Sequence, residues 1–314
     1  MKFHLRCYGA PAASLLAAGL ATTLLAVRTA ATEAGAAKTD TATTPAAAVK
    51  TKSNAVENSV VKVFSAVRYP DPYKPWAKQA PTDVTGSGVV IEGKRILTSA
   101  HVVLYASQVQ VLANQAGDKV SATVEAVAPG MDLAVLKLDD ETFFDSHPPL
   151  PRAKSLPAIK EVVLAYGYPT GGNTLSITRG IVSRIEFAAY NFPAAGLRIQ
   201  IDAALNPGNS GGPAVAAGDK MIGLACSILV GTQNIGYIIP SEEIELFLHD
   251  IADGHYVGKT VMFDECQTLG NPAVRSYLKL DKSVQGVIVH KPDSDDPAYP
   301  LKNGMLLRRL VIHP

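Results

Sequence analysis

The sequence is poor in cysteine and carries almost no net charge. Its 314 residues include three cysteines, too few for a disulfide-rich framework, and no Cys/His spacing is typical of a zinc site. The 29 basic residues nearly balance the 28 acidic ones, so there is no electrostatic reason to expect nucleic acid as a partner. No internal repeat occurs at a solenoid or propeller period. What remains is a globular protein that is long enough for a sizeable core.

The N-terminus has the composition of a targeting segment. Residues 1–31 carry three basic side chains and no acidic one, and the 21 residues from 7 to 27 carry no charge. A basic start, an apolar stretch and small residues near position 31 are typical of a secretory signal peptide, which predicts export to the periplasm or the extracellular space. An uncleaved membrane anchor is one alternative, although a stretch rich in Ala, Thr, Gly and Ser spans a bilayer weakly. An organellar transit peptide is the other.

Residues 32–53 form a different kind of segment. They contain seven Ala and six Thr among 22 residues, and they show no period and no apolar face. This composition predicts a disordered linker, so we expect the folded part to begin near Asn54.

From Ser59 onward, short β-branched runs alternate with Gly, Pro and Asp. Gly93-Lys94 separates two such runs as a two-residue loop, which predicts a type II′ hairpin. Helical periodicity is confined to residues 241–251, where Ser241 can cap a helix. This pattern predicts an all-β barrel or sandwich with one helix at its end. The predicted strands cover residues 88–92, 95–99, 109–112, 120–127, 133–138, 161–166, 176–178, 180–186, 197–201, 212–215, 221–227 and 236–239.

Ser210 lies in the glycine-rich string Gly208-Asn209-Ser210-Gly211-Gly212. A serine that attacks an amide needs exposure, a base for its proton and donors for the developing oxyanion. The flanking glycines permit a tight turn that aims the N–H groups of Gly208, Asn209 and Ser210 into one small space. Taken alone, the string also fits an ordinary glycine-rich turn.

His101 and Asp132 supply the other two parts of a catalytic triad. His101 follows the end of a predicted strand, and Asp132 immediately precedes the apolar run 133–138. A lone histidine is more often structural, but a buried Asp132 needs a partner, and a histidine N–H is a suitable one. The order His–Asp–Ser on a background of strands matches the chymotrypsin arrangement and differs from the subtilisin and α/β-hydrolase orders. Together the three signals predict the triad His101, Asp132 and Ser210.

With these residues placed, the chain resembles the HtrA/Deg family of trypsin-like serine proteases. The resemblance implies two six-stranded antiparallel β-barrels and a C-terminal helix over residues 54–251, with the triad between the barrels. A partial PDZ-like α+β segment over residues 256–314 would follow. The motifs that carry the resemblance are residues 86–90, 98–101, 132–135, 178–183, 206–212 and 236–240.

The resemblance also implies an activity. The protein would be a serine endopeptidase that needs no cofactor and hydrolyses unfolded polypeptides. Ser210 would attack the scissile carbonyl, His101 would carry the proton, and Asp132 would orient the imidazole. The backbone N–H groups around Gly208 and Ser210 would hold the oxyanion.

The positions that match the family's primary specificity pocket are Leu205 and the strand residues Tyr237, Ile238 and Ile239. None of them is acidic, so nothing there could pair with a Lys or Arg side chain of a substrate. We therefore expect cleavage after small or medium aliphatic residues such as Val, Ala, Ile or Leu.

Two further readings of the sequence stay open. The active-site loops, for which residues 187–196 and 229–235 are candidates, could rest in an inactive arrangement, and the protein would then act as a chaperone-like polypeptide-binding module.

The aromatic, Pro-rich segment 69–76 holds the only tryptophan. It is either a solvated loop or, as aromatic residues near the N-terminus do in the family, it helps to build a homotrimer.

The C-terminal region departs from the family pattern. Residues 256–314 are fewer than a PDZ domain needs, and the expected glycine of a carboxylate-binding loop is missing, so peptide capture there is in doubt. Half a sheet would leave open strand edges. Cys226 lies in an apolar run and is more typical of a buried small residue than of a redox switch. Its pairing with Cys266 stays open.

Overall fold

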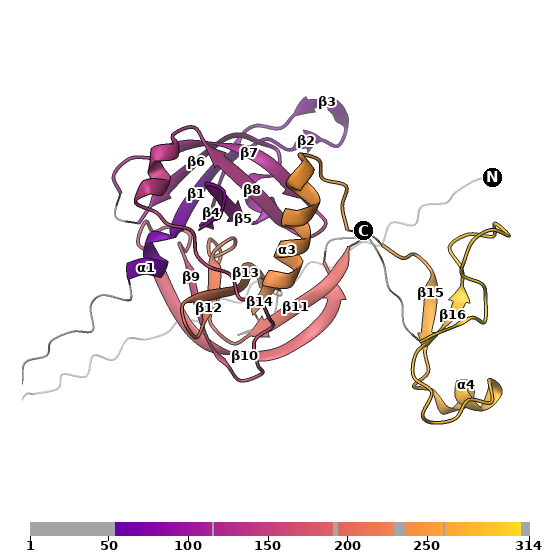
Figure 1. Cartoon of the computed structure of the whole chain (residues 1–314). Helices are drawn as coiled ribbons and strands as arrows, with labels where there is room; N and C mark the ends of the chain where they lie inside the picture. The colour runs from indigo at the N-terminus through magenta and orange to yellow at the C-terminus, as the bar shows by residue number, and fades with distance from the viewer. Residues whose placement is uncertain (1–53, 115, 191–193, 229–235, 260, 309–314) are drawn as a thin grey trace, which may run out of the picture. The chain divides into compact units, whose positions relative to one another are not determined.

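The structure is a computed structural model that describes residues 54–114, 116–190, 194–228, 236–259 and 261–308. Two closed antiparallel barrels of six strands each make up most of it (Figure 1). The first barrel is built before residue 139 and the second after residue 161. The predicted all-β fold with two six-stranded barrels is therefore confirmed. The predicted segments 1–31 and 32–53 lie outside the described residues.

The first barrel closes because β6 pairs back onto β1, in the order β1-β4-β5-β8-β7-β6. Alternate residues of its strands face inward, and Val61, Val63, Ile96, Val111 and Leu136 are fully buried there. Its strands are β1 (Val60–Val67), β4 (Thr82–Ile91), β5 (Arg95–Thr98), β6 (Ala106–Ala113), β7 (Val120–Ala128) and β8 (Leu133–Leu138). The short helices α1 (Asn54–Asn58) and α2 (Ala100–Val103) and the 3-10 turn η1 (Glu141–Asp145) flank them.

The second barrel follows the order β10-β11-β14-β13-β12-β9. Val163, Ile199, Ile201 and Ile238 are fully buried in its interior. The two predicted strands at 176–178 and 180–186 are one continuous strand, because β10 pairs with β9 without interruption from Ser176 to Ile181. The strands are β9 (Val162–Gly167), β10 (Ser176–Ala189), β11 (Ala195–Ile201), β12 (Pro213–Ala216), β13 (Lys220–Ile228) and β14 (Gly236–Pro240).

A third cluster of buried side chains joins the two barrels to the predicted helix, which is α3 (Ser241–Asp250), followed by the short 3-10 turn η2 (Ile251–Asp253). Leu97 from the first barrel, Leu224 from the second and Phe247 from α3 all belong to it. Burial of large apolar side chains contributes roughly 1.5–3 kcal/mol each, so this cluster stabilises the contact between the barrels.

The predicted capping role of Ser241 is wrong. Ser241 occupies the first helical position, after Pro240 as N-cap, and its hydroxyl donates to the Met221 carbonyl at 2.9 Å. The predicted type II′ hairpin at Gly93 is also wrong. Ile91 pairs with Arg95 across three residues, and Gly93 and Lys94 both have positive φ (81° and 56°). A type II′ turn requires positive φ only at its first central residue.

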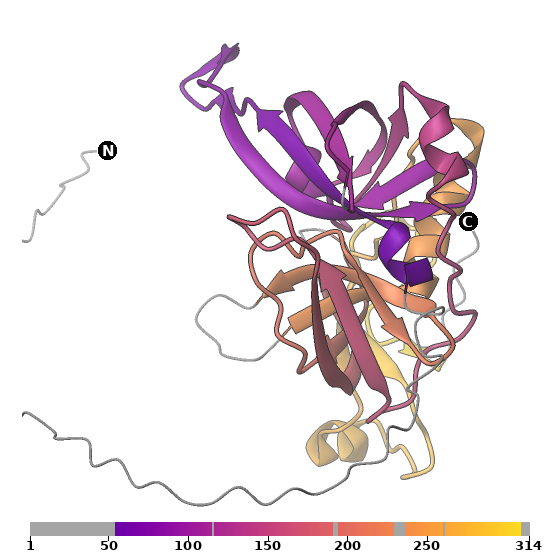
Figure 2. The same cartoon turned by 90° about the vertical axis from the view of Figure 1, so that its left-hand side faces the viewer.

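The segment between β1 and β4 forms a small hairpin of β2 (Pro70–Asp71) and β3 (Lys74–Lys78). It extends away from the first barrel, as the purple ribbon in Figure 2 shows. Tyr73 and Trp76 are 91% and 85% exposed. The aromatic segment is thus ordered as a hairpin, with both of these rings in solvent.

The C-terminal residues 261–308 contain β15 (Glu265–Thr268), α4 (Pro272–Tyr277), β16 (Val287–Lys291) and β17 (Leu306–Leu307). The three strands pair in the order β15-β16-β17. Leu269 and Val289 are the buried apolar side chains of this region. With two strand pairings and two buried apolar side chains, it is far smaller than either barrel.

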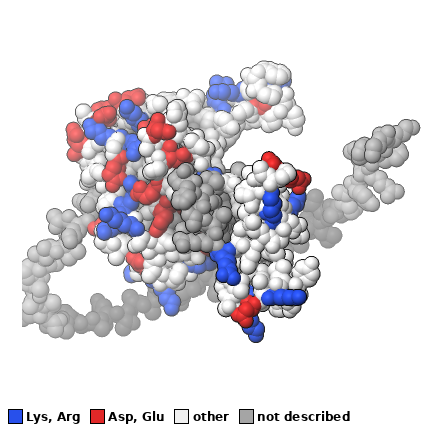
Figure 3. Space-filling view, turned by 45° about the vertical axis from the view of Figure 1, so that its right-hand side comes forward, with Lys and Arg blue, Asp and Glu red and all other residues white. Residues whose placement is uncertain are grey.

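Surface charge and membrane-spanning helices are two features that bear on the partners of the protein. In the face that Figure 3 displays, basic and acidic side chains are interspersed over the barrels. None of the helices within the described ranges combines the length and the apolar composition that crossing a bilayer requires.

Candidate active site

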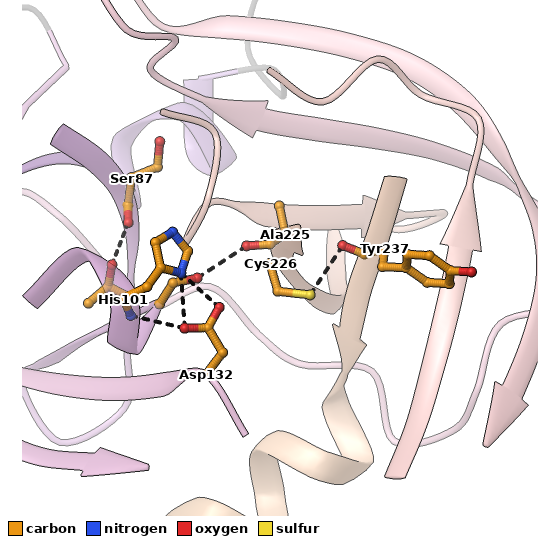
Figure 4. A network of polar contacts seen from close by, with 8 residues as sticks. Ser87, His101, Asp132, Ala225, Cys226 and Tyr237 are labelled. Atoms are coloured by element: carbon orange, nitrogen blue, oxygen red, sulfur yellow. Dashed lines mark hydrogen bonds and ion pairs between the residues drawn. The ribbon is translucent and has the colours of Figure 1, made fainter. Parts of the chain in front are cut away.

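His101 and Asp132 meet at one end of the first barrel. Strand β5 pairs with β8, with Thr98 opposite Ala134, so the residues just after β5 lie beside those just before β8. His101 Nδ1 lies 2.9 Å from both carboxylate oxygens of Asp132 (Figure 4). The backbone N–H of His101 donates to Asp132 Oδ1 at 2.9 Å as well. The histidine and the carboxylate are therefore held together by side-chain and main-chain contacts within one barrel.

The electrostatics of this pair suit a general base. Burial by itself lowers the pKa of His101, but the hydrogen bond to Asp132 and its negative charge outweigh burial, and the net pKa is raised above the ordinary 6.5. Because a carboxylate only accepts hydrogen bonds, Nδ1 must carry the proton. In the neutral ring the lone pair then sits on Nε2, which is the atom that can take a proton from a nucleophile.

Ser210 lies in the turn between β11 and β12. Gly208 and Gly211 on either side of it have φ of +98° and +86°, a region that side chains disfavour. A Cβ on Gly208 would collide with the Tyr168 carbonyl, and one on Gly211 would collide with the Ser87 carbonyl. Both glycines are thus required by backbone conformation and by close approach, which accounts for the composition of this string.

The N–H groups of the turn are used unequally. The Asn209 N–H donates to the Asn206 carbonyl at 2.9 Å, so this predicted oxyanion donor is engaged within the turn. The N–H groups of Gly208 and Ser210 donate to no acceptor among the described residues. Two of the three predicted donors therefore remain available to a bound oxyanion.

His101, Asp132 and Ser210 line one cavity of about 830 Å³. The structure brings the three predicted triad residues to the same hollow from both barrels. Both Ser210 and His101 are described, yet no hydrogen bond joins Ser210 Oγ to His101 Nε2. Such catalytic hydrogen bonds are often long in a free enzyme and tighten when substrate binds.

The wall of this cavity differs from the predicted specificity pocket. Leu205, Tyr237, Ile238 and Ile239 are absent from its described lining. Ile238 faces the interior of the second barrel, and Ile239 packs in the cluster between the barrels. Leu205 packs against Gly236, where an added Cβ would lie 2.7 Å from its Cδ1.

Four second-barrel residues form a further part of the wall: Ala189, Tyr190, Arg198 and Cys226. The first two fall in the predicted active-site loop 187–196, whereas sequence reasoning gave Arg198 and Cys226 no place in the site. The Arg198 guanidinium lies 4.2 Å from the centre of the Tyr190 ring, a cation–π contact. No local motif marks these positions, because β10, β11 and β13 bring them together from distant parts of the chain. Only the alternation of β11, which buries Ile199 in the barrel core, indicates that its neighbour Arg198 faces the other way.

Ser87, which lies in β4 of the first barrel, is bonded to the turn that carries Ser210. Its hydroxyl donates to the Gly208 carbonyl at 2.7 Å and accepts from the Tyr168 N–H at 2.8 Å. Its own N–H donates to the Ser210 carbonyl at 2.8 Å. Ser87 is fully buried, so these bonds are shielded from water. The motif around Ser87 was recognised in the sequence without a role for its hydroxyl.

Of the two cysteines in the described residues, one lines the cavity. Cys226 is buried, and its Sγ donates to the Tyr237 carbonyl at 3.5 Å (Figure 4). Cys266 is exposed, and no disulfide joins it to Cys226. Within the described ranges, no group of three or more His, Cys, Asp and Glu side chains could hold a metal ion.

Comparison with known proteins defines the class first. Residues 86–224 match the model of the trypsin-like peptidase domain. The chain is 39% identical over 260 residues to "Protease Do-like 4, mitochondrial" of Arabidopsis thaliana, covering 81% of this chain and 50% of that protein. It is also 39% identical over 252 residues to "Protease Do-like 2, chloroplastic" of the same plant, covering 79% and 41%.

A solved structure described as "HtrA-type protease AlgW with tripeptide" superposes with a TM-score of 0.63 at 27% identity, covering 81% of this chain and 79% of that one. The chain belongs to the HtrA/Deg family of trypsin-like serine proteases. It spans about half or less of the length of the two plant relatives.

Proposed function

We propose that this protein is a serine endopeptidase of polypeptides, with His101, Asp132 and Ser210 as its catalytic triad. The single observation that carries the proposal is the bonded His101–Asp132 pair lining the same cavity as Ser210. Ser210 Oγ attacks the scissile carbonyl, and His101 Nε2 takes its proton and returns it to the leaving amine. Water then hydrolyses the acyl-enzyme, with His101 again as the base. Asp132 stays ionised throughout and stabilises the imidazolium.

The oxyanion donors in this proposal are the N–H groups of Gly208 and Ser210. Both lack an acceptor among the described residues, whereas the Asn209 N–H is engaged by Asn206. Fixed donors of this kind stabilise the tetrahedral intermediate because they need no reorganisation during the reaction.

For the residue before the scissile bond, we propose a preference for small or medium aliphatic side chains. Ala189 and Cys226 offer small, apolar surface in the cavity wall, and the Arg198 cation disfavours a substrate Lys or Arg in the same cavity. Fluorogenic peptides that differ only in this residue test the preference. Higher kcat/KM on the Val than on the Arg peptide is expected, and the reverse order would contradict it.

A latent protease that binds polypeptides is the second candidate. In this candidate, the Ser210–His101 hydrogen bond, which the described residues do not form, would close only when a polypeptide binds. Of the loops predicted to govern such a state, residues 191–193 and 229–235 lie outside the described residues. Added unfolded polypeptide should then raise the rate of Ser210 acylation, whereas a constitutively assembled site would show no increase.

The first experiment is reaction of the protein with a fluorophosphonate probe, followed by mass spectrometry of the labelled peptide. Labelling of Ser210 that is lost in His101→Ala supports an assembled triad. Labelling that appears only with unfolded polypeptide supports the latent form. No labelling under either condition, in folded protein, would overturn the enzyme assignment.

Two further proposals concern the assembly of the protein and its location in the cell. We infer a homotrimer from the exposed Tyr73 and Trp76 of the β2–β3 hairpin, which sedimentation of a monomer at micromolar concentration would contradict.

Residues 1–31, outside the described part, are proposed as a targeting segment. The names of the two plant relatives, mitochondrial and chloroplastic, favour an organelle over export. Cell fractionation of the full chain decides between the two destinations.

A further inference from the structure

Lys62 is a buried lysine with neutral partners. It lies in β1 and is only 4% exposed, whereas lysines are almost never buried to this degree unless they are paired with an acid. Its Nζ donates to the Gly172 carbonyl at 2.6 Å and to Asn173 Oδ1 at 2.9 Å. Burial, and to a smaller degree the charge of Lys119, lowers the pKa of Lys62. Burying this cation costs desolvation free energy, so its buried position indicates a role for the contacts that it makes.

The partners of Lys62 belong to the loop between β9 and β10, which contacts the turn that carries Ser210. The Thr170 N–H donates to the Pro207 carbonyl at 2.8 Å. An added Cβ on Gly208 would lie 2.6 Å from the Thr170 nitrogen, so the loop and the turn are in direct contact. Thr170 also lines the catalytic cavity.

This contact sets the direction of one oxyanion donor. The peptide between Pro207 and Gly208 is planar and trans, so its carbonyl and its N–H point in opposite directions. Because Thr170 holds the Pro207 carbonyl, the Gly208 N–H is turned away from the loop. If the loop moved, the peptide would lose the bond that keeps this orientation.

The loop is anchored from the first barrel at two places. Ser87 Oγ accepts the Tyr168 N–H at the start of the loop, and Lys62 holds Gly172 and Asn173 further along it. Thr170 lies between the two anchors. We propose that Lys62 is a positioning residue that fixes the Gly208 N–H by anchoring the loop of residues 168–173, an inference that rests on the proposed oxyanion role of Gly208.

Lys62→Met tests this role because it keeps most of the aliphatic stem and removes the donors. Loss of one oxyanion donor costs about 10²–10³ in kcat, so a loosened donor should lower kcat by about 10- to 100-fold with little change in KM. Affinity for a peptide boronate, which mimics the tetrahedral intermediate, should fall by a similar factor. Substrate affinity measured in a Ser210→Ala background should not change. Lys62→Arg, which keeps the charge and donors, should recover part of the loss.

Lys119→Met is the matched control. Lys119 is exposed, and its Nζ lies 3.7 Å from the centre of the Phe64 ring, over which Lys62 Nζ also lies at 4.9 Å. It makes none of the loop contacts, so kcat and boronate affinity should stay at the wild-type level. An equal loss in both variants would overturn the proposal, because it would reflect general charge or stability.

Amide hydrogen exchange provides a readout that does not depend on activity. In Lys62→Met, the Thr170 amide should exchange at least about 10-fold faster, because the loop that carries Thr170 is no longer anchored and its bond to the Pro207 carbonyl opens more often. Unchanged exchange at Thr170 would overturn the positioning role even if activity fell. Failure of the wild-type protein to react at Ser210 would instead count against the proposed function, and the exchange result would still decide the role of Lys62.

Discussion

The two barrels prepare their shares of the site in different ways. In the first barrel, His101 and Asp132 are bonded directly to each other, and the β5–β8 pairing and the main-chain bond from His101 to Asp132 bring them together within that barrel. In the second barrel, the turn that carries Ser210 has bonds of its own, such as that from the Asn209 N–H to the Asn206 carbonyl, and further bonds from Ser87 of the first barrel and Thr170 of the β9–β10 loop. A glycine-rich turn has few side chains with which to stabilise itself, so its geometry depends on its neighbours. The proposed base is thus organised within one barrel, whereas the turn of the proposed nucleophile also depends on Ser87 of the other barrel.

This contrast predicts different consequences for substitutions in the two groups. Changes to the first group should remove a chemical role and leave the backbone of the turn intact. Changes to the contacts around the turn should misplace the oxyanion donors while the His101–Asp132 pair persists. The following expectations run from the largest effect to the smallest.

Ser210→Ala should reduce kcat by about 10⁶-fold, to the residual rate that binding and oxyanion stabilisation provide. The change removes only the Oγ atom, so the melting temperature should stay close to that of the wild type. Peptide hydrolysis and circular dichroism measure the two quantities. Near-wild-type hydrolysis by the variant would remove Ser210 from the mechanism.

Asp132→Asn should lower kcat by about 10⁴-fold. An amide can donate to Nδ1, which favours the wrong tautomer of His101 and leaves no lone pair on Nε2. Because the pair belongs to the first barrel, the turn around Ser210 should keep its structure, as amide exchange of residues 207–212 would reveal. Altered exchange there would break the comparison between the barrels.

Ser87→Ala should lower kcat by about 10²-fold, because it releases both the Gly208 carbonyl and the start of the loop at Tyr168. Each unpaired buried group also costs about 1–3 kcal/mol of stability. Ser59→Ala is the matched control, since this buried hydroxyl donates to the Pro148 carbonyl at 2.7 Å, outside the catalytic cavity. It should lose stability and keep kcat, and a similar loss of kcat in both variants would contradict a specific role for Ser87.

The pH dependence gives the smallest expected change. Only neutral His101 can accept the Ser210 proton, and its pKa is raised above 6.5. The acid limb of kcat/KM should therefore have its midpoint above pH 6.5 and fall by about tenfold per unit below it. A midpoint at or below 6.5 would mean that Asp132 does not outweigh burial in the free enzyme.

Much of the fold could be predicted because its signals are local. The apolar run 133–138 has the same bounds as β8, and the helical pattern from Ser241 gave α3 to within a residue. The turn at Gly93 and the capping of Ser241 were predicted wrongly. Strand register decided the first, and a tertiary acceptor, the Met221 carbonyl, drew the Ser241 hydroxyl away in the second.

By itself, the sequence determined the strand-rich architecture, the order of His101, Asp132 and Ser210, and the glycine turn, because spacing and backbone conformation are local properties of a chain. Only the tertiary structure decided which residues line the cavity and which hold the turn. Arg198, Ser87 and Lys62 come from separate strands, and nothing in the residues beside them specifies the partner that each one meets. Those contacts arise when two closed barrels pack together, and that packing is a property of the whole fold.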